Sequence, residues 1–91
     1  MKINKKEILE NHCYTELVYE RINKKLKTSF SKNEIEIFIK RVLSEAPIED
    51  YLKKGKNFYI TNKQDNIKIT INSNTFRVIT VNSIIKKSSN E

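Results

Sequence analysis

Apolar residues recur at helical spacing before Pro47 and alternate with polar residues after Gly55. The most regular helical stretch has the apolar positions Ile35, Phe38, Ile39, Val42, Leu43 and Ala46, which form one continuous stripe. Ser31 and Glu34 have the spacing of a capping box, which marks the start of a helix. Pro47 disfavours helical geometry for the residue before it. The pattern therefore predicts a helix that ends at Pro47.

Two shorter helical patterns precede this helix. Asn4 and Glu7 have the spacing of an N-cap and its reciprocal partner, so a helix is predicted to begin at Lys5. Thr15 is a candidate cap for a second helix. The apolar positions are Ile8 and Leu9 in the first pattern, and Val18, Tyr19, Ile22 and Leu26 in the second. The sequence leaves open whether these are two helices or one long bent helix.

The alternating part of the chain predicts three strands, at 57–62, 67–72 and 75–81. The segment 53–56, which contains the only glycine, reads as a polar joint before them. Ser73-Asn74 reads as a two-residue hairpin loop, in which Asn tolerates a positive φ. With these loops one sheet face is wholly apolar, made of Phe58, Ile60, Ile67, Ile69, Ile71, Phe76 and Val78. A slip of one residue would scatter these side chains over both faces, which supports the register.

The predicted fold is α+β, with two to three N-terminal helices packed on one face of a three-stranded antiparallel β-meander. We expect a single domain over residues 1–91. Its helical layer spans about 4–46, its meander about 57–81, and a polar tail follows at 86–91. A chain of 91 residues has room for one core and little room for a deep cavity of its own.

The opposite sheet face would carry two cross-strand rows. They are Tyr59–Thr70–Arg77 and Thr61–Lys68–Ile79, with Val81 beyond. Ile79 and Val81 are unexpected on a polar face. They could lie under the C-terminal tail or mark a subunit interface, and of these two explanations we favour self-association.

Positive charge is concentrated in the strand-forming half. Residues 1–50 carry ten Lys or Arg and nine Asp or Glu, a net charge of +1, whereas residues 51–91 carry eight and two, a net charge of +6. Fifteen of the eighteen basic residues are Lys, beside eleven Asn and fourteen Ile, a combination typical of AT-rich coding. The excess of Lys is therefore weak evidence for an anionic partner. The placement of the charge, and the single Arg in the strands, Arg77, are better evidence.

Several classes of protein are not expected. With one cysteine, Cys13, the chain has no internal disulfide, and it suits a reducing compartment. No apolar run is long enough for a membrane span, and no apolar segment of a signal peptide follows the charged start. We expect a cytoplasmic protein without membrane contact. His12 and Cys13 are neighbours on a helical pattern and would point about 100° apart, so they form no catalytic dyad by themselves.

No catalytic or metal motif stands out. There is no second Cys or His for a metal site, no Gly-rich phosphate loop and no nucleophile elbow. We expect a protein that is not an enzyme and that holds no metal or cofactor.

The candidate binding site is the row Tyr59, Thr70 and Arg77. The row offers a ring for stacking, a hydroxyl and a guanidinium suited to phosphate. Lys56, Lys68, Asn57 and Asn72 could surround it. A solvent-facing sheet is also ordinarily lined with these residue types, so both interpretations stay open. One aromatic residue on this face is fewer than the aromatic ladder of a single-strand RNA platform.

Four segments resemble a family of short bacterial and phage proteins, the domain of unknown function 3781. They are Cys13-Tyr14-Thr15, Val18 to Leu26, Gly55 to Tyr59, and Ile69 to Val81. The resemblance spans most of residues 7–85 and brings no activity, cofactor or site residue with it. It implies a free-standing small protein in a setting that includes mobile elements, where small proteins often sequester a ligand or block a host complex.

These observations lead to one expected function and two alternatives. We expect a non-catalytic protein that captures an anionic, phosphate-bearing ligand of the nucleotide type, at a site shared between protomers of a homo-oligomer. In a phage it would act as a counter-defence sponge for a signalling nucleotide. The alternatives are an inhibitor that binds nucleic acid or nucleoprotein, as anti-CRISPR proteins do, and a protein–protein interaction module.

Overall fold

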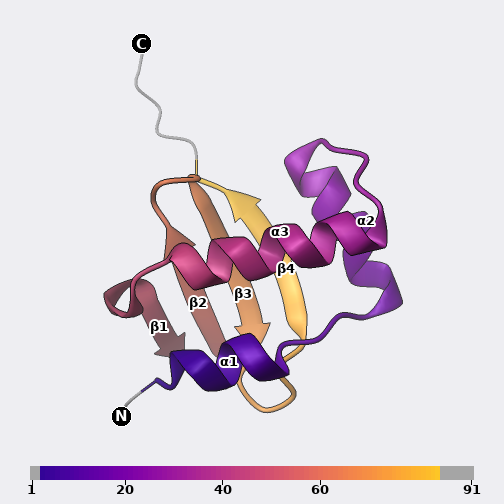
Figure 1. Ribbon diagram of the computed structural model, residues 1–91. Coiled ribbons are helices and arrows are strands. Elements are labelled where there is room, and N and C mark those ends of the chain that lie inside the picture. Colours follow the sequence, from indigo (N-terminus) through magenta and orange to yellow (C-terminus); the bar gives the residue numbers. More distant parts are fainter. Residues whose placement is uncertain (1–2, 85–91) are drawn as a thin grey trace.

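The computed structural model describes residues 3–84, which form an α+β fold (Figure 1). The helices are α1 (Lys5–Asn11), α2 (Glu16–Leu26) and α3 (Lys32–Glu45), followed by the 3₁₀ helix η1 (Ile48–Asp50). The strands are β1 (Tyr51–Lys54), β2 (Asn57–Asn62), β3 (Ile67–Asn72) and β4 (Val78–Ser83). All neighbours are antiparallel and the strand order is β1-β2-β3-β4. The predicted polar tail, 86–91, lies outside the described residues.

The helices take two different positions around the sheet. Helices α1 and α3 cross one face, whereas α2 lies beside the edge strand β4 (Figure 1). The fully buried apolar side chains come from every layer and include Ile8, Ile22, Ile35, Ile39, Leu43, Ile60, Ile69 and Ile71. The apolar stripe predicted for α3 and the apolar face predicted for β2 and β3 therefore meet in one core.

The helix starts follow the predicted caps. Ser31 and Glu34 form the reciprocal capping box, with Glu34 N–H donating to Ser31 Oγ at 3.1 Å and Ser31 N–H donating to Glu34 Oε1 at 2.8 Å. Asn4 Oδ1 accepts from the Glu7 N–H at 3.0 Å. Thr15 occupies the N-cap position of α2, but its side chain makes no capping hydrogen bond. The two N-terminal patterns are separate helices, because the chain between them is not helical.

The prediction of three strands is wrong, because a fourth strand ends within the segment read as a polar joint. Strand β1 pairs with β2 through a two-residue loop, Gly55-Lys56. Gly55 has a φ of +62°, and a glycine at the first loop position is typical of a type II′ hairpin turn. Tyr51 of this strand is buried, and its hydroxyl donates to the Leu43 carbonyl at 2.7 Å. The lysines that made the segment look like a joint lie on the open edge of the sheet, where lysine limits edge-to-edge pairing.

The predicted register is confirmed for one strand pair and wrong for the other. Between β2 and β3 the partners are as predicted, for example Ile60 with Ile69. Between β3 and β4, Ile71 lies opposite Val78 and not opposite Phe76. The loop is longer than the predicted Ser73-Asn74, and β4 begins at Val78 and not at Thr75.

A bulge in β4 explains why the apolar residues Ile79 and Val81 were expected on the polar face of the sheet. The register shifts between Thr70 and Ile71, so that Ile79 is the extra residue of the β4 strand. Val81 consequently lies opposite Ile69 and is fully buried in the core. Ile79 is half-buried and lines a pocket beside α2. The feature that favoured self-association is thus explained within one chain.

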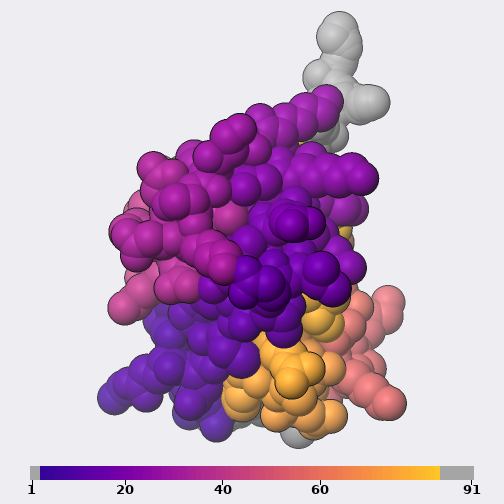
Figure 2. Space-filling model, turned by 90° about the vertical axis from the view of Figure 1, so that its right-hand side faces the viewer, coloured from indigo at the N-terminus to yellow at the C-terminus, as the bar shows by residue number. Residues whose placement is uncertain are grey.

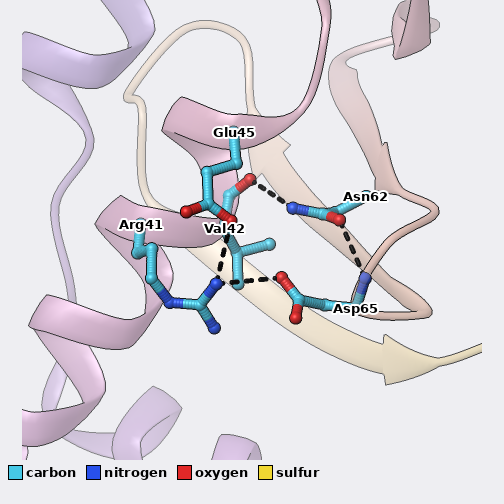
Figure 3. A network of polar contacts seen from close by, with 5 residues as sticks. All are labelled: Arg41, Val42, Glu45, Asn62 and Asp65. Carbon is cyan, nitrogen blue, oxygen red and sulfur yellow. Dashed lines mark hydrogen bonds and ion pairs between the residues drawn. The ribbon is translucent and has the colours of Figure 1, made fainter.

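A polar network fastens α3 to the turn between β2 and β3 (Figure 3). The buried Asn62 donates through Nδ2 to the Val42 carbonyl at 3.0 Å and accepts from the Asp65 N–H at 2.9 Å. Arg41 forms ion pairs with Glu45 at 2.9 Å and with Asp65 at 3.1 Å. The network fixes the helical layer against β2 and thereby leaves the other sheet face free of helix α3.

Candidate functional site

The sheet face opposite α1 and α3, called the outer face below, carries the polar positions of all four strands. Its cross-strand rows are Leu52–Tyr59–Thr70–Thr80, Lys54–Asn57–Asn72 and Thr61–Lys68–Asn82. Five of the seven predicted site residues, Tyr59, Thr70, Lys68, Asn57 and Asn72, lie on this face. The alternation of β2 and β3 places them there.

Tyr59 and Lys68 form the centre of the outer face. The Lys68 ammonium lies 5.9 Å from the centroid of the Tyr59 ring, within the range of a cation–π contact. Asn57 Nδ2 donates to the Tyr59 hydroxyl at 3.4 Å. Tyr59 and Lys68 are both half-buried, so the ring and the ammonium are held on the sheet while each keeps part of its surface exposed.

An open concavity of about 580 Å³ adjoins this pair. It is lined by Glu49, Asp50, Tyr51, Leu52, Lys54, Gly55, Tyr59, Thr61 and Lys68. The newly found strand β1 therefore supplies one wall. The lining combines cations, the half-buried Tyr59 ring and two carboxylates, of which Asp50 is paired with Lys63 at 3.5 Å.

The other predicted site residues have structural roles or lie at the margin. Thr70 is 6% exposed, and opposite it the Thr80 hydroxyl is buried without a hydrogen-bond partner in the described residues. Asn72 Oδ1 accepts from the N–H groups of Asn74 and Thr75 and so shapes the loop. Lys56 lies in the β1–β2 turn, where its carbonyl accepts from Ser73 N–H at 2.8 Å.

Arg77, the residue expected to bind phosphate beside Thr70, is not in that row. Thr80 takes its place, and Arg77 forms a parallel β-bridge with Cys13. Together with Arg21, Arg77 lines a separate pocket of about 200 Å³ between α2 and the start of β4. The predicted constellation of Tyr59, Thr70 and Arg77 is therefore divided between two places.

Helix α2 brings further cations to the edge of the sheet. Arg21 donates to the Ile79 carbonyl at 3.1 Å, and Lys25 donates to Asn82 Oδ1 at 3.1 Å. Figure 2 shows α2, in purple, lying over the edge of the sheet, with yellow β4 emerging beside it. Arg21, Lys25, Leu52 and Lys54 are not among the site residues predicted from the sequence. The two-residue loop Gly55-Lys56 was a signal for Leu52 and Lys54, because such a loop implies a strand before it. The apolar residues at 79 and 81 were a signal for the bulge in β4, which places Thr80 and not Arg77 opposite Thr70.

His12 and Cys13 form no dyad, because their side chains have different partners. His12 Nδ1 lies 2.9 Å from the Leu9 carbonyl, which can only accept, so Nδ1 carries a proton. His12 Nε2 lies 3.1 Å from the Tyr14 hydroxyl. The Cys13 sulfur lies 3.6 Å from the carbonyl oxygens of Thr75 and Phe76.

An aromatic pair continues from His12 towards α3. The rings of Tyr14 and Tyr19 stack with centroids 5.5 Å apart, and the Tyr19 hydroxyl donates to Glu36 Oε2 at 2.6 Å. This hydrogen bond raises the pKa of Tyr19 to about 12, and burial raises the pKa of Tyr14 still further above its ordinary value. Both tyrosines stay protonated at neutral pH. This arrangement stabilises neutral phenols and does not favour a tyrosinate nucleophile.

The described part of the chain has neither a group of metal-ligating side chains nor a helix suited to span a membrane. Residues 3–84 contain no group of three His, Cys, Asp or Glu side chains placed to hold a metal ion. Over the same residues, no helix combines the length and the apolar character that crossing a bilayer requires.

The chain is similar to one family of known proteins. The model of a family described as protein of unknown function (DUF3781) matches residues 6–82. The match includes every helix and strand except the first residue of α1 and the last residue of β4. No curated protein and no solved structure is significantly similar to the chain.

Proposed function

The chain belongs to this DUF3781 family, and we propose that it is a non-catalytic protein that binds a phosphate-bearing ligand of the nucleotide type on its outer face. The observation that carries the proposal is the pairing of the Lys68 ammonium with the Tyr59 ring at the margin of the concavity. A cation beside a partly exposed aromatic ring suits a ligand that joins a phosphate to a planar base.

The other side chains of the concavity support a nucleotide over a simple anion. Lys54 and Lys68 supply positive charge for the phosphate, and neither forms an ion pair among residues 3–84. Glu49 and Asp50 also line the concavity. Carboxylates commonly accept hydrogen bonds from ribose hydroxyls in nucleotide sites. A ligand with phosphate, base and sugar uses all three kinds of group, whereas inorganic phosphate uses one.

The distribution of charge also favours the outer face as the side that binds the ligand. Three of the ion pairs use acidic residues of α2 or α3 or the turn beside α3: Lys32 with Glu16, and Arg41 with Glu45 and with Asp65. On the outer face, the strands contribute lysines and no carboxylate. The strand lysines would therefore attract an anionic group to the part of the outer face away from Glu49 and Asp50, the two carboxylates of η1 that line the concavity.

A site shared between two copies is part of the proposal. Strand β1 is an open edge of the sheet, and its Leu52, 58% exposed, lines the concavity. A second copy that paired at this edge would cover Leu52 and deepen an otherwise open depression. Sequestration of a signalling nucleotide would use such a site stoichiometrically and leave the ligand intact.

A thermal-shift screen against mono- and dinucleotides at low ionic strength tests the proposal, because a ligand that binds only the native state raises its melting temperature. We expect stabilisation by one class of nucleotide and recovery of that nucleotide unchanged after incubation. Native mass spectrometry of the same sample would report the number of ligands per chain and the number of chains per complex. Absence of stabilisation by every nucleotide would overturn the proposal, and a chemically altered ligand would overturn its non-catalytic part.

A further inference from the structure

We propose that the ligand is a single strand of nucleic acid, whose backbone runs from the outer face along β4 to a second phosphate site at Arg77. The inference rests on the proposed function and extends it from one nucleotide to several. Four cations carry the argument. Arg77, Arg21, Lys25 and Lys68, called the basic row below, belong to three elements or loops that meet along β4.

The second phosphate site is the pocket between α2 and the start of β4. It is lined by Thr15, Leu17, Val18, Arg21, Arg77, Val78 and Ile79, and its volume of about 200 Å³ suits a phosphate group better than a whole nucleotide. No hydrogen bond or ion pair involves the Arg77 guanidinium among residues 3–84, and that residue is exposed. Arg21 donates one N–H to Ile79 and keeps further donors free.

The arginines are better evidence for an anion-binding site than the lysines, because AT-rich coding explains an excess of lysine and not the presence of arginine. The chain holds fifteen Lys and three Arg. Arg41 is bound in the network with Glu45 and Asp65. The remaining two line one pocket that includes no carboxylate. Two like charges brought together without an acid repel each other unless an anion lies between them, and guanidinium groups match the geometry of phosphate.

The basic row is continuous because α2 runs beside β4. Arg21 and Lys25 are one helical turn apart and therefore lie on the same side of α2. Arg21 reaches the Ile79 carbonyl and Lys25 reaches the Asn82 side chain, further along the same strand. Asn82 lies opposite Lys68 on β3, and Lys68 contacts the Tyr59 ring. The row thus joins the Arg77 pocket to the concavity of the proposed nucleotide site.

The length of the row exceeds one nucleotide. Arg77 and Asn82 are five residues apart, but the bulged Ile79 adds little length, so the separation is about 13 Å at the rise of a β-strand. Phosphate groups attached to one nucleoside do not span that distance, whereas successive phosphates of a strand do. Domains that bind single strands without reading their sequence combine cations that follow the backbone with aromatic rings on which bases stack, and here Tyr59 supplies one such ring beside Lys68.

The experiment compares a nucleoside monophosphate with oligothymidylates of about 4 to 16 nucleotides, the range of site sizes of single-strand binding domains. Fluorescence anisotropy at several salt concentrations would be measured for the native protein, Arg77→Gln, Lys25→Gln and the control Lys6→Gln. Lys6 is an exposed cation of α1, on the helical side, so its removal changes the net charge equally without touching the row.

We expect affinity to rise with oligonucleotide length until the row is filled. Arg77→Gln should weaken oligonucleotide binding about tenfold or more, and should lower the slope of log affinity against log salt by about one. Arg77→Gln should bind the monophosphate as tightly as the native protein does. Lys6→Gln should change the affinity for the oligonucleotide, and that for the monophosphate, by much less than tenfold.

Failure of this inference and failure of the proposed function give different results. Affinity that does not increase with length, with Arg77→Gln equal to Lys6→Gln, would overturn the strand proposal and leave the nucleotide site standing. Absence of binding to the monophosphate and to every oligonucleotide would overturn both. A loss on Arg77→Gln that Arg77→Lys fully restores would show that charge alone matters, and would overturn the assignment of a guanidinium-specific phosphate site.

Discussion

Arg77 forms its β-bridge with Cys13, and this pairing moves it away from Thr70. The Cys13 N–H donates to the Phe76 carbonyl at 2.9 Å, and the Val78 N–H donates to the Cys13 carbonyl at 2.9 Å. The chain between α1 and α2 thereby extends the sheet by one bridge at the start of β4. The bridge positions the Arg77 pocket, because it ties the loop before β4 to the segment that leads into α2.

The bridge uses the backbone of Cys13, which gives a prediction with a matched control. Cys13→Pro removes the N–H that donates to Phe76, and should lower the free energy of unfolding by about 1–3 kcal/mol through the unpaired carbonyl and the altered backbone. Cys13→Ala keeps the N–H and should cost less than about 1 kcal/mol, because this side chain is exposed. Urea denaturation of both variants checks the prediction. Equal losses would contradict the role given to the bridge.

Asn62 gives a second prediction about stability. Its amide is buried and joins the Val42 carbonyl to the Asp65 N–H (Figure 3). Asn62→Leu keeps a similar volume but leaves two polar groups without their partner, so the free energy of unfolding should fall by about 2 kcal/mol or more. Asn33→Ala, an exposed change in α3, should stay within about 0.5 kcal/mol. A loss for Asn62→Leu as small as that for Asn33→Ala would show that the network does not fasten α3 to the sheet.

The alkaline limit of stability depends on Tyr51. Burial raises the pKa of Tyr51 from 10.0 to about 12, so the folded state holds its proton where the unfolded state has lost it. Stability from this group is therefore complete below pH 10.0 and declines as the pH rises towards about 12. The free energy of unfolding should fall less steeply over this interval in Tyr51→Phe than in the native protein. Parallel pH profiles for the two proteins would contradict this assignment.

The sequence correctly predicts the parts of the fold in which apolar and polar residues alternate along each strand and a short loop joins neighbouring strands. Strands β2 and β3 meet these conditions, and their register is the predicted one, with Ile60 opposite Ile69. The α3 helix is likewise fixed by a local capping box and an uninterrupted stripe. In β1 only Tyr51 is buried, so apolar and polar residues do not alternate clearly enough to distinguish a strand from a polar segment. The signal for this strand is the Gly55-Lys56 loop, whose glycine has a positive φ.

The start of β4 could not be predicted from local pattern, for two physical reasons. Phe76 has a φ of +61°, a conformation that bulky residues rarely adopt, so a turn built on it is not expected from residue type. The conformation is accompanied by the Cys13 bridge and by packing of Phe76 against Phe58, with ring centroids 6.3 Å apart. Both partners are distant in sequence. The residue given most weight in the binding site, Arg77, lies next to this turn, which explains why its neighbours were predicted wrongly.

A nucleotide site on the outer face is tested by the affinity of Lys68→Gln for a fluorescent ATP analogue at low ionic strength, compared with that of Lys6→Gln. We expect Lys68→Gln to weaken binding by about 1.5–3 kcal/mol, the contribution of a hydrogen bond to a charged group. Lys6→Gln should change the affinity by less than about 0.5 kcal/mol, because it lies on the helical side. Equal affinities for the two variants would contradict a nucleotide site on the outer face.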